Sequence, residues 1–119
     1  MLIELLKSKI HRATVTDARL DYEGSITIDR ELMQAAGLVL HEKVHVLNLN
    51  NGERFETYVI EGKQKSGTIC LNGAAARLVQ KNDLVIVAAY IYLTPEAAKN
   101  WQPKVVKVNA KNRIMDRTK

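Results

Sequence analysis

The longest apolar run of the chain, Leu84 to Tyr92, sets the first limit on what it can fold into. The run is rich in β-branched residues, which favour a buried strand, and we expect that strand to cross the core. A helix that spans a bilayer needs roughly 20 apolar residues, and no run in the sequence approaches that length. Glu4 and Lys7 interrupt the apolar amino terminus, unlike a secretory signal. We therefore expect a cytoplasmic protein that has no contact with a membrane.

Short strand-like segments separated by turn signals occur along the whole sequence. The stretch from Ile10 to Thr16 alternates and contains β-branched residues, so the opening of the chain is predicted to be β throughout. The Asn51-Gly52 pair lies between two alternating segments and predicts a hairpin. The expected strands are 2–16, 44–49, 55–60, 68–71, 84–92 and 105–108.

Few helices are expected, and all of them are short. The clearest begins at Asp29, which is suited to the amino-terminal cap, and ends at Gly37. The alanine-rich segment 74–79 predicts a second short helix. Thr94 and Pro95 predict a helical turn over 95–100, because a capping residue precedes a proline at the first helical position.

The chain is long enough for one compact core. It has 119 residues, of which 46% are hydrophobic, so a single domain is expected. Residues 41–46 and 81–86 both run from a polar turn into a strand, which indicates a barrel with two related halves. The pattern predicts a mainly β, single-domain barrel over 1–112, followed by a polar basic tail over 113–119.

Charge and cysteine content limit the classes of function. The formal net charge of +5 is compatible with a nucleic acid partner or with an acidic small substrate. The single cysteine, Cys70, lies in an apolar run and is predicted to be a small buried hydrophobe. His41 and His45 are alternate residues of an expected strand, but a third ligand is lacking, so no metal site is predicted.

The Gly24-Ser25 pair carries the groups needed to cleave its own peptide bond. A serine hydroxyl can attack the preceding carbonyl and convert the amide to an ester, if the fold holds the backbone in the required geometry. Elimination then breaks the chain and leaves a dehydroalanine, which hydrolyses to a pyruvoyl group. By itself, however, Gly-Ser is an ordinary turn pair.

Several blocks of sequence strengthen the interpretation that Gly24-Ser25 is a self-cleavage site. In order they are Lys9–Arg12, Tyr22–Ser25, Ala35–Gly37, Asn51–Phe55, Thr57–Tyr58, Asn72–Ala76, and Trp101 before Pro103. Taken together they resemble the pyruvoyl-dependent aspartate 1-decarboxylases, which make β-alanine for pantothenate synthesis. The resemblance covers nearly the whole chain.

The resemblance has implications for architecture as well as activity. It implies a double-psi β-barrel that assembles as a homotetramer, with active sites between subunits. It also implies self-cleavage between Gly24 and Ser25, giving a β chain of residues 1–24 and an α chain of residues 25–119. The expected substrate is L-aspartate and the expected cofactor is the pyruvoyl group derived from Ser25, with no metal and no nucleic acid partner.

The resemblance also implies roles for residues that contact the substrate. Ser25 becomes the ketone that forms an imine with the substrate amine and accepts the charge left by decarboxylation. Arg54 is the expected clamp for the carboxylate that is retained, because a guanidinium matches a carboxylate. Lys9 adds positive charge, and Tyr58 is the acid that protonates the carbanion.

A second set of residues is expected to support cleavage and orientation. Thr57 should donate to the Gly24 carbonyl oxygen as it becomes an oxyanion, and adjacent strand residues such as Thr57 and Tyr58 point to opposite faces. Asn72 and the backbone amides of Gly73, Ala74 and Ala75 should orient the substrate or the cleavage loop. His11 and Tyr22 are given supporting roles only.

Two positions depart from the usual pattern of the family. Leu47 stands where some relatives carry tryptophan, which affects the shape of the pocket. Asn82 replaces a glycine at a turn, and asparagine tolerates left-handed backbone angles. The chain lacks the longer carboxy-terminal extension of some relatives, on which a maturation factor can act, so autonomous cleavage is expected.

Two other functions stay open on the residues alone. A small basic β-barrel could be a DNA-binding regulator, which the net charge and the basic tail favour. A structural barrel with an inert Gly-Ser loop is the third alternative.

Overall fold

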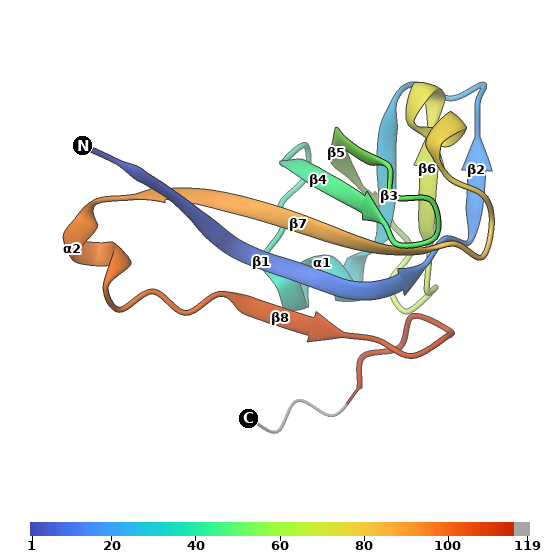
Figure 1. Cartoon of the computed structure of the whole chain (residues 1–119). Helices are drawn as coiled ribbons and strands as arrows, with labels where there is room; N and C mark the ends of the chain where they lie inside the picture. Colours follow the sequence, from blue (N-terminus) through green and yellow to red (C-terminus); the bar gives the residue numbers. More distant parts are fainter. Residues whose placement is uncertain (116–119) are drawn as a thin grey trace.

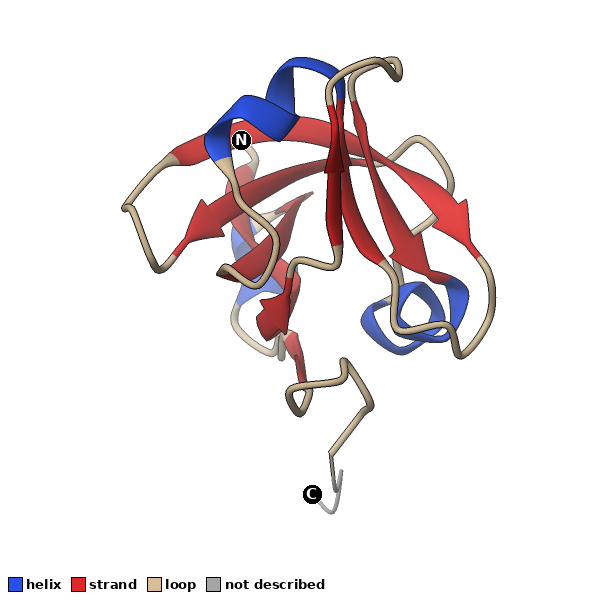
Figure 2. Cartoon of the chain, turned by 90° about the vertical axis from the view of Figure 1, so that its right-hand side faces the viewer, coloured by secondary structure: helices blue, strands red, loops and turns tan. Residues whose placement is uncertain are grey.

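The structure, a computed structural model, describes residues 1–115, and they form a mainly β architecture with short helices (Figures 1 and 2). The elements in order are β1 (Ile3–Thr14), β2 (Asp17–Arg19), β3 (Ser25–Asp29), α1 (Arg30–Ala36), β4 (Lys43–Asn48), β5 (Arg54–Gly62), β6 (Ile69–Asn72), the 3-10 helix η1 (Gly73–Leu78), β7 (Leu84–Leu93), α2 (Pro95–Ala98) and β8 (Lys104–Lys107). The predicted strands are all present, and β2 and β3 add to them.

The strands form one sheet that curls into a barrel. Their order is β2-β6-β3-β5-β4-β7-β1-β8. The link from β1 to β2 connects the β2–β6 side of this order to the β7–β1 side. Val15 N–H donates to Asp83 O just before β7, and Thr16 N–H donates to Ile69 O of β6, both at 2.8 Å. The predicted closed barrel is thus present, and a single bent stretch of chain closes it.

Parallel and antiparallel pairs are mixed. Within residues 1–115, β1 with β8, β2 with β6, and β3 with β5 run parallel, and the remaining strand pairs are antiparallel. The predicted β4–β5 hairpin is among the antiparallel pairs, and Gly52 in its turn has a positive φ of 79°.

The two halves predicted from the sequence have equivalent turns. His41 and Asn82 both have positive φ, 73° and 80°. His41 N–H donates to Val59 O and Val59 N–H to Glu42 O; in the same way, Asn82 N–H donates to Val15 O and Val15 N–H to Asp83 O. The backbone pattern is therefore repeated, and the left-handed conformation expected of Asn82 is observed.

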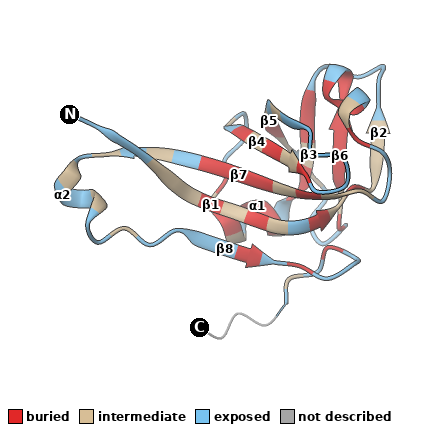
Figure 3. Ribbon diagram, viewed as in Figure 1, coloured by how far each residue is buried: buried red, intermediate tan, exposed pale blue. Residues whose placement is uncertain are grey.

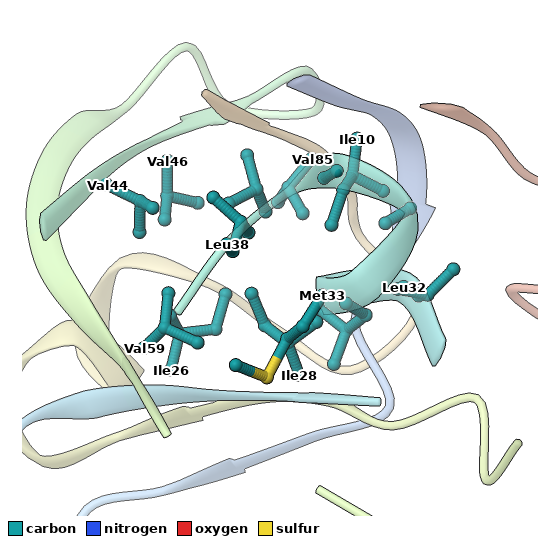
Figure 4. Packing of buried hydrophobic residues seen from close by; sticks show 14 of the residues in the cluster. Ile10, Ile26, Ile28, Leu32, Met33, Leu38, Val44, Val46, Val59 and Val85 are labelled. Carbon is teal, nitrogen blue, oxygen red and sulfur yellow. The ribbon is translucent and has the colours of Figure 1, made fainter. Parts of the chain in front are cut away.

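Strands β3 and β6 are buried over most of their length (Figure 3), and aliphatic side chains from the inner face of the sheet and from α1 fill the barrel (Figure 4). Asp29 caps α1 by accepting from Glu31 N–H at 2.8 Å, and Gly37 ends the helix in the left-handed conformation, as predicted. Leu32 and Met33 on α1 are buried against the core. Each large aliphatic residue that is fully buried contributes roughly 1.5–3 kcal/mol to stability.

Three details differ from the sequence prediction. The alanine-rich helix is a 3-10 helix that starts at Gly73. Only the first part of β7 is buried, and Tyr90 and Tyr92 are exposed where β1 and β7 extend away from the barrel toward α2 (Figure 3). The tail predicted to begin at residue 113 is wrong for 113–115, because Ile114 pairs with Val108 and packs against the core. Residues 116–119 of that tail lie outside the described residues.

The part of the chain that the structure describes contains no helix that is long and apolar enough to cross a membrane.

Candidate active site

The antiparallel pairing of β3 with β6 places Ser25 opposite Asn72. Ser25 is 2% exposed and Asn72 is 1% exposed. Asn72 Nδ2 donates to Ser25 Oγ at 3.0 Å and to Thr27 Oγ1 at 3.0 Å. Ser25 Oγ in turn donates to the Glu23 carbonyl oxygen at 3.1 Å. The hydroxyl that was predicted to attack the chain is therefore buried and fixed by two hydrogen bonds.

Gly24, the residue before Ser25, lies directly against Gly73. A Cβ atom at Gly73 would stand 2.6 Å from Gly24 Cα, 2.6 Å from Gly24 N and 2.8 Å from Tyr22 O. Gly73 also has a φ of 66°, which disfavours a side chain. Because no other residue would allow this approach, Gly73 determines where the cleavage loop sits.

Side chains of β2 hold the loop that leads to Gly24. Arg19 Nη1 donates to Tyr22 Oη at 3.2 Å, and the Arg19 Cζ atom lies 5.3 Å from the centre of the Tyr22 ring. Arg19 Nε donates to Asp17 Oδ2 at 2.9 Å, and this hydrogen bond lowers the pKa of the Asp17 carboxyl. Tyr22 therefore contacts β2 from the loop that carries Gly24 and leads to Ser25.

A polar hollow of about 290 Å³ opens beside these residues. Tyr22, Thr27, Cys70 and Asn72 contribute to its lining. The hollow lies on the outer face of the β3–β6 pair, because Ile26 and Leu71, the residues that alternate with Ser25 and Asn72, are in the core.

Strand β5 runs parallel to β3 and carries the two residues expected beside Ser25. The register pairs Ile26 with Val59; continued backward, it aligns Ser25 with Tyr58 and Gly24 with Thr57. Tyr58 is 36% exposed, and its ring lies edge-on to His41, 6.0 Å between centres. Thr57 is half-buried and pairs with the core residue Val44, so the two side chains face opposite sides as predicted.

Arg54 is the first residue of β5 and lies on the same face of the strand as Tyr58. It is exposed and pairs with Leu47 of β4, the position where the sequence departs from its relatives. Within residues 1–115, neither Arg54 nor Lys9 forms an ion pair. Leu47 is thus a neighbour of the predicted carboxylate clamp and does not line the Ser25 hydroxyl.

Lys9 and His11 lie on β1, which β5, β4 and β7 separate from Ser25 in the sheet order. Lys9 pairs with Ala88 of β7 and with Val105 of β8. Burial, followed by the positive charges of Lys9, Arg12 and Lys107, lowers the pKa of His11, and its Nδ1 atom is buried without a hydrogen-bond partner among the described residues. The fold of one chain therefore brings Ser25, Asn72 and Gly73 together, and it leaves Lys9 and His11 on another strand.

The residues around Ser25 fit the precursor of a pyruvoyl group. A serine preceded by glycine is held in a buried position with an amide donor on its oxygen, which is the precursor such a group requires. Among the residues that the structure describes, no three His, Cys, Asp or Glu side chains converge in a way that could hold a metal ion.

Sequence reasoning missed Thr27, Cys70 and Arg19. Thr27 and Cys70 pair across β3 and β6, two residues along the ladder from Ser25 and Asn72, so all four side chains share one face. The alternation of polar residues at positions 25 and 27, and at 70 and 72, is the signal that could have found them.

The chain is similar to known proteins over nearly its whole length. Residues 1–115 match the sequence profile of a family described as aspartate decarboxylase. Three relatives are each named aspartate 1-decarboxylase. The relative from Caldicellulosiruptor saccharolyticus is 67% identical over 115 residues, 97% of this chain and 90% of its own. That from Acetivibrio thermocellus is 60% identical over 116 residues, 98% of this chain and 92% of its own.

The third relative is from Dehalococcoides mccartyi. It is 62% identical over 110 residues, which cover 92% of this chain and 89% of its own. The match spans the barrel, the loop with Gly24 and Ser25, and the 3-10 helix that supports it. The chain therefore belongs to the aspartate decarboxylase family of lyases and has its double-psi β-barrel fold.

Proposed function

We propose that this protein is an aspartate 1-decarboxylase that converts L-aspartate to β-alanine and carbon dioxide for pantothenate synthesis. The proposal places it in the cytoplasm as a homotetramer with active sites between subunits. Membership of the family supports the reaction. The single observation that carries the mechanism is the buried Ser25 hydroxyl, fixed by Asn72 beside the Gly24–Gly73 contact.

The catalytic group is made from Ser25 by cleavage of the chain into residues 1–24 and 25–119. Ser25 Oγ attacks the Gly24 carbonyl carbon, and its proton passes to the Ser25 nitrogen as the C–N bond breaks, so the amide becomes an ester with a free amine at Ser25. Elimination then removes the Ser25 Cα proton and breaks the Cβ–O bond, so that Gly24 leaves as a carboxylate and residue 25 becomes dehydroalanine. Addition of water and loss of ammonia then leave a pyruvoyl group.

Asn72, Gly73 and Thr57 assist that cleavage. The Asn72 amide already donates to Ser25 Oγ, so it stabilises negative charge on this oxygen as the proton leaves. Gly73 holds Gly24 in place. Thr57, which the continued register aligns with Gly24, donates to the carbonyl oxygen during attack.

Substrate binding uses the residues that are open to solvent. When formed, the pyruvoyl group supplies an electrophilic carbonyl next to an amide, which accepts the electron pair released with carbon dioxide. Arg54 holds the carboxylate that is kept, and Lys9 adds positive charge. Tyr58, aligned with residue 25 on the adjacent strand, donates a proton to the substrate carbon that lost its carboxylate.

The amides of Gly73, Ala74 and Ala75 orient the bound substrate, and His11 and Tyr22 support the site. Lys9 lies across the sheet from Ser25 within a chain, which supports a site completed by a second subunit.

Mass measurement under denaturing conditions, combined with an assay for β-alanine, tests this function. After warm incubation, the purified protein should give two fragments that divide between Gly24 and Ser25, the larger one blocked at its amino terminus. It should also release β-alanine and carbon dioxide from L-aspartate.

Ser25→Ala should stay intact and produce no β-alanine. A wild-type chain that never cleaves would overturn the proposed cofactor, as would β-alanine production by Ser25→Ala. Light scattering checks the assembly, for which the proposal requires four chains.

A further inference from the structure

Cys70 is a buried nucleophilic group that the mechanism above does not use, and it contacts a residue that the mechanism does use. It is 5% exposed, and its Sγ atom lies 3.4 Å from Asn72 Oδ1. On the other side of the same amide, Nδ2 donates to Ser25 Oγ and to Thr27 Oγ1. Both ends of the Asn72 side chain are therefore occupied.

The direction of the Asn72 amide matters because Ser25 has already used its only proton. Ser25 Oγ donates to the Glu23 carbonyl, so this oxygen can only accept from Asn72. If the amide turned over, Asn72 Oδ1 would face the lone pairs of Ser25 Oγ, and Nδ2 would face a sulfur atom, which is a weak acceptor. The residue at position 70 thus helps to decide which atom of Asn72 faces the hydroxyl.

The thiol is suited to donate. Burial raises the pKa of the Cys70 thiol, the nearby Asp17 carboxyl raises it further, and Arg19 opposes them. A protonated S–H can donate to Asn72 Oδ1, whereas a thiolate would repel this oxygen.

We propose that Cys70 is a positioning residue for self-cleavage: its thiol holds the Asn72 amide with the nitrogen toward Ser25 Oγ. The effect reaches Ser25 only through Asn72. This inference rests on the proposed function, because it concerns the rate at which the bond between Gly24 and Ser25 breaks.

The test is the rate of cleavage, followed by mass under denaturing conditions, in wild type and four variants of the full chain. Cys70→Ala and Cys70→Val bracket the volume of cysteine and remove the donor, so both should cleave roughly 2- to 10-fold more slowly, as expected for one net hydrogen bond. Cys70→Ser keeps a donor and should stay within about twofold of wild type. Thr68→Val, in the same hollow but without a hydrogen bond to Asn72, should match wild type.

A double-mutant cycle separates positioning from general loosening of the fold. In an Asn72→Ala background, Cys70→Ala should slow cleavage no further, because the amide that it orients is gone. Thermal unfolding monitors whether each variant is folded at the incubation temperature. Cys70→Ala and Cys70→Val at the wild-type rate, Cys70→Ser as slow as Cys70→Ala, or additive effects with Asn72→Ala would each overturn the inference. Failure of wild type to cleave would instead overturn the proposed function.

Discussion

Ser25 and Arg54 lie on neighbouring strands, but they differ in burial and in their contacts. Ser25 is buried, hydrogen-bonded to Glu23 and Asn72, and backed by the contact between Gly24 and Gly73. Arg54 is exposed, and within residues 1–115 it has no ion-pair partner. The contacts around Ser25 come from within one chain, whereas the Arg54 guanidinium is exposed to solvent.

The difference separates two tasks that the proposed enzyme performs. The proposed self-cleavage occurs once and needs a fixed hydroxyl beside the bond, which one folded chain supplies. Turnover needs charged groups that a substrate with two carboxylates can reach, so those groups cannot be buried in internal pairs. Variants of the buried residues around Ser25 should therefore change the rate of cleavage. Variants of exposed residues such as Arg54 and Tyr58 should change turnover in chains that have already been cleaved.

The largest effect is expected from Gly73→Ala. The new Cβ would lie 2.6 Å from Gly24, and its φ of 66° adds strain, so cleavage should fall at least about 100-fold, which corresponds to about 2.7 kcal/mol. Gly52→Ala is the matched control, because its φ is 79° but nothing lies within 4 Å of its Cβ position. The measurement is the fraction of cleaved chain over time. Equal cleavage rates for the two variants would show that the close approach to Gly24 is unimportant.

Tyr58→Phe should cleave normally and then turn over slowly. Loss of the acid should reduce kcat roughly 10²-fold or more, because general acids contribute about 10²- to 10⁴-fold. Steady-state β-alanine production by the fully cleaved variant is the readout. Tyr92→Phe, which removes the hydroxyl of an exposed tyrosine on β7, should behave as wild type. Unchanged kcat in Tyr58→Phe would assign the proton transfer to another group.

Arg54→Gln should raise KM about tenfold or more and leave the cleavage rate unchanged, because a charge-assisted hydrogen bond is worth roughly 1.5–3 kcal/mol. Arg30→Gln on α1, also exposed, is the control. Slow cleavage in Arg54→Gln would contradict the division between the two regions.

Co-expression of Arg54→Gln with Ser25→Ala tests whether the Ser25 and Arg54 of one site come from different chains. If a site combines Ser25 of one chain with Arg54 of another, mixed assemblies of Ser25→Ala and Arg54→Gln should contain sites that have the wild-type KM. Mixed assemblies that form but show only the raised KM of Arg54→Gln would place both residues of a site in the same chain.

Much of the local structure could be predicted from the sequence. Asp29 and Gly37 mark the ends of α1 because capping depends on residues next to the helix. Asn51-Gly52 predicts the hairpin because the type of turn depends on the residues within it. The left-handed backbone angle at Asn82 follows from the conformations that asparagine tolerates. Residues 113–115 were predicted incorrectly, because the pairing of Ile114 with Val108 and the burial of Asn112 depend on distant parts of the chain.

The candidate site shows the same division. The resemblance directed attention to Gly24, Ser25, Tyr58 and Asn72, but it gave no contacts among them. The hydrogen bond between Asn72 and Ser25 joins residues 47 positions apart, and no local pattern encodes such a pairing. Cys70 was predicted to be a plain buried hydrophobe, and its burial is correct, yet its contact with Asn72 arises only from the register of β3 with β6.

The sequence by itself therefore determined the strands, the capped helix, the reactive Gly-Ser pair and the family, because each depends on nearby residues or on shared blocks of residues. Only the tertiary structure decided that Gly73 presses against Gly24, that Asn72 holds the Ser25 hydroxyl, and that Arg54 stays open to solvent while Lys9 is half-buried on another strand. The physical reason is that strand register and barrel closure bring distant residues together, and these depend on how the whole apolar core is buried.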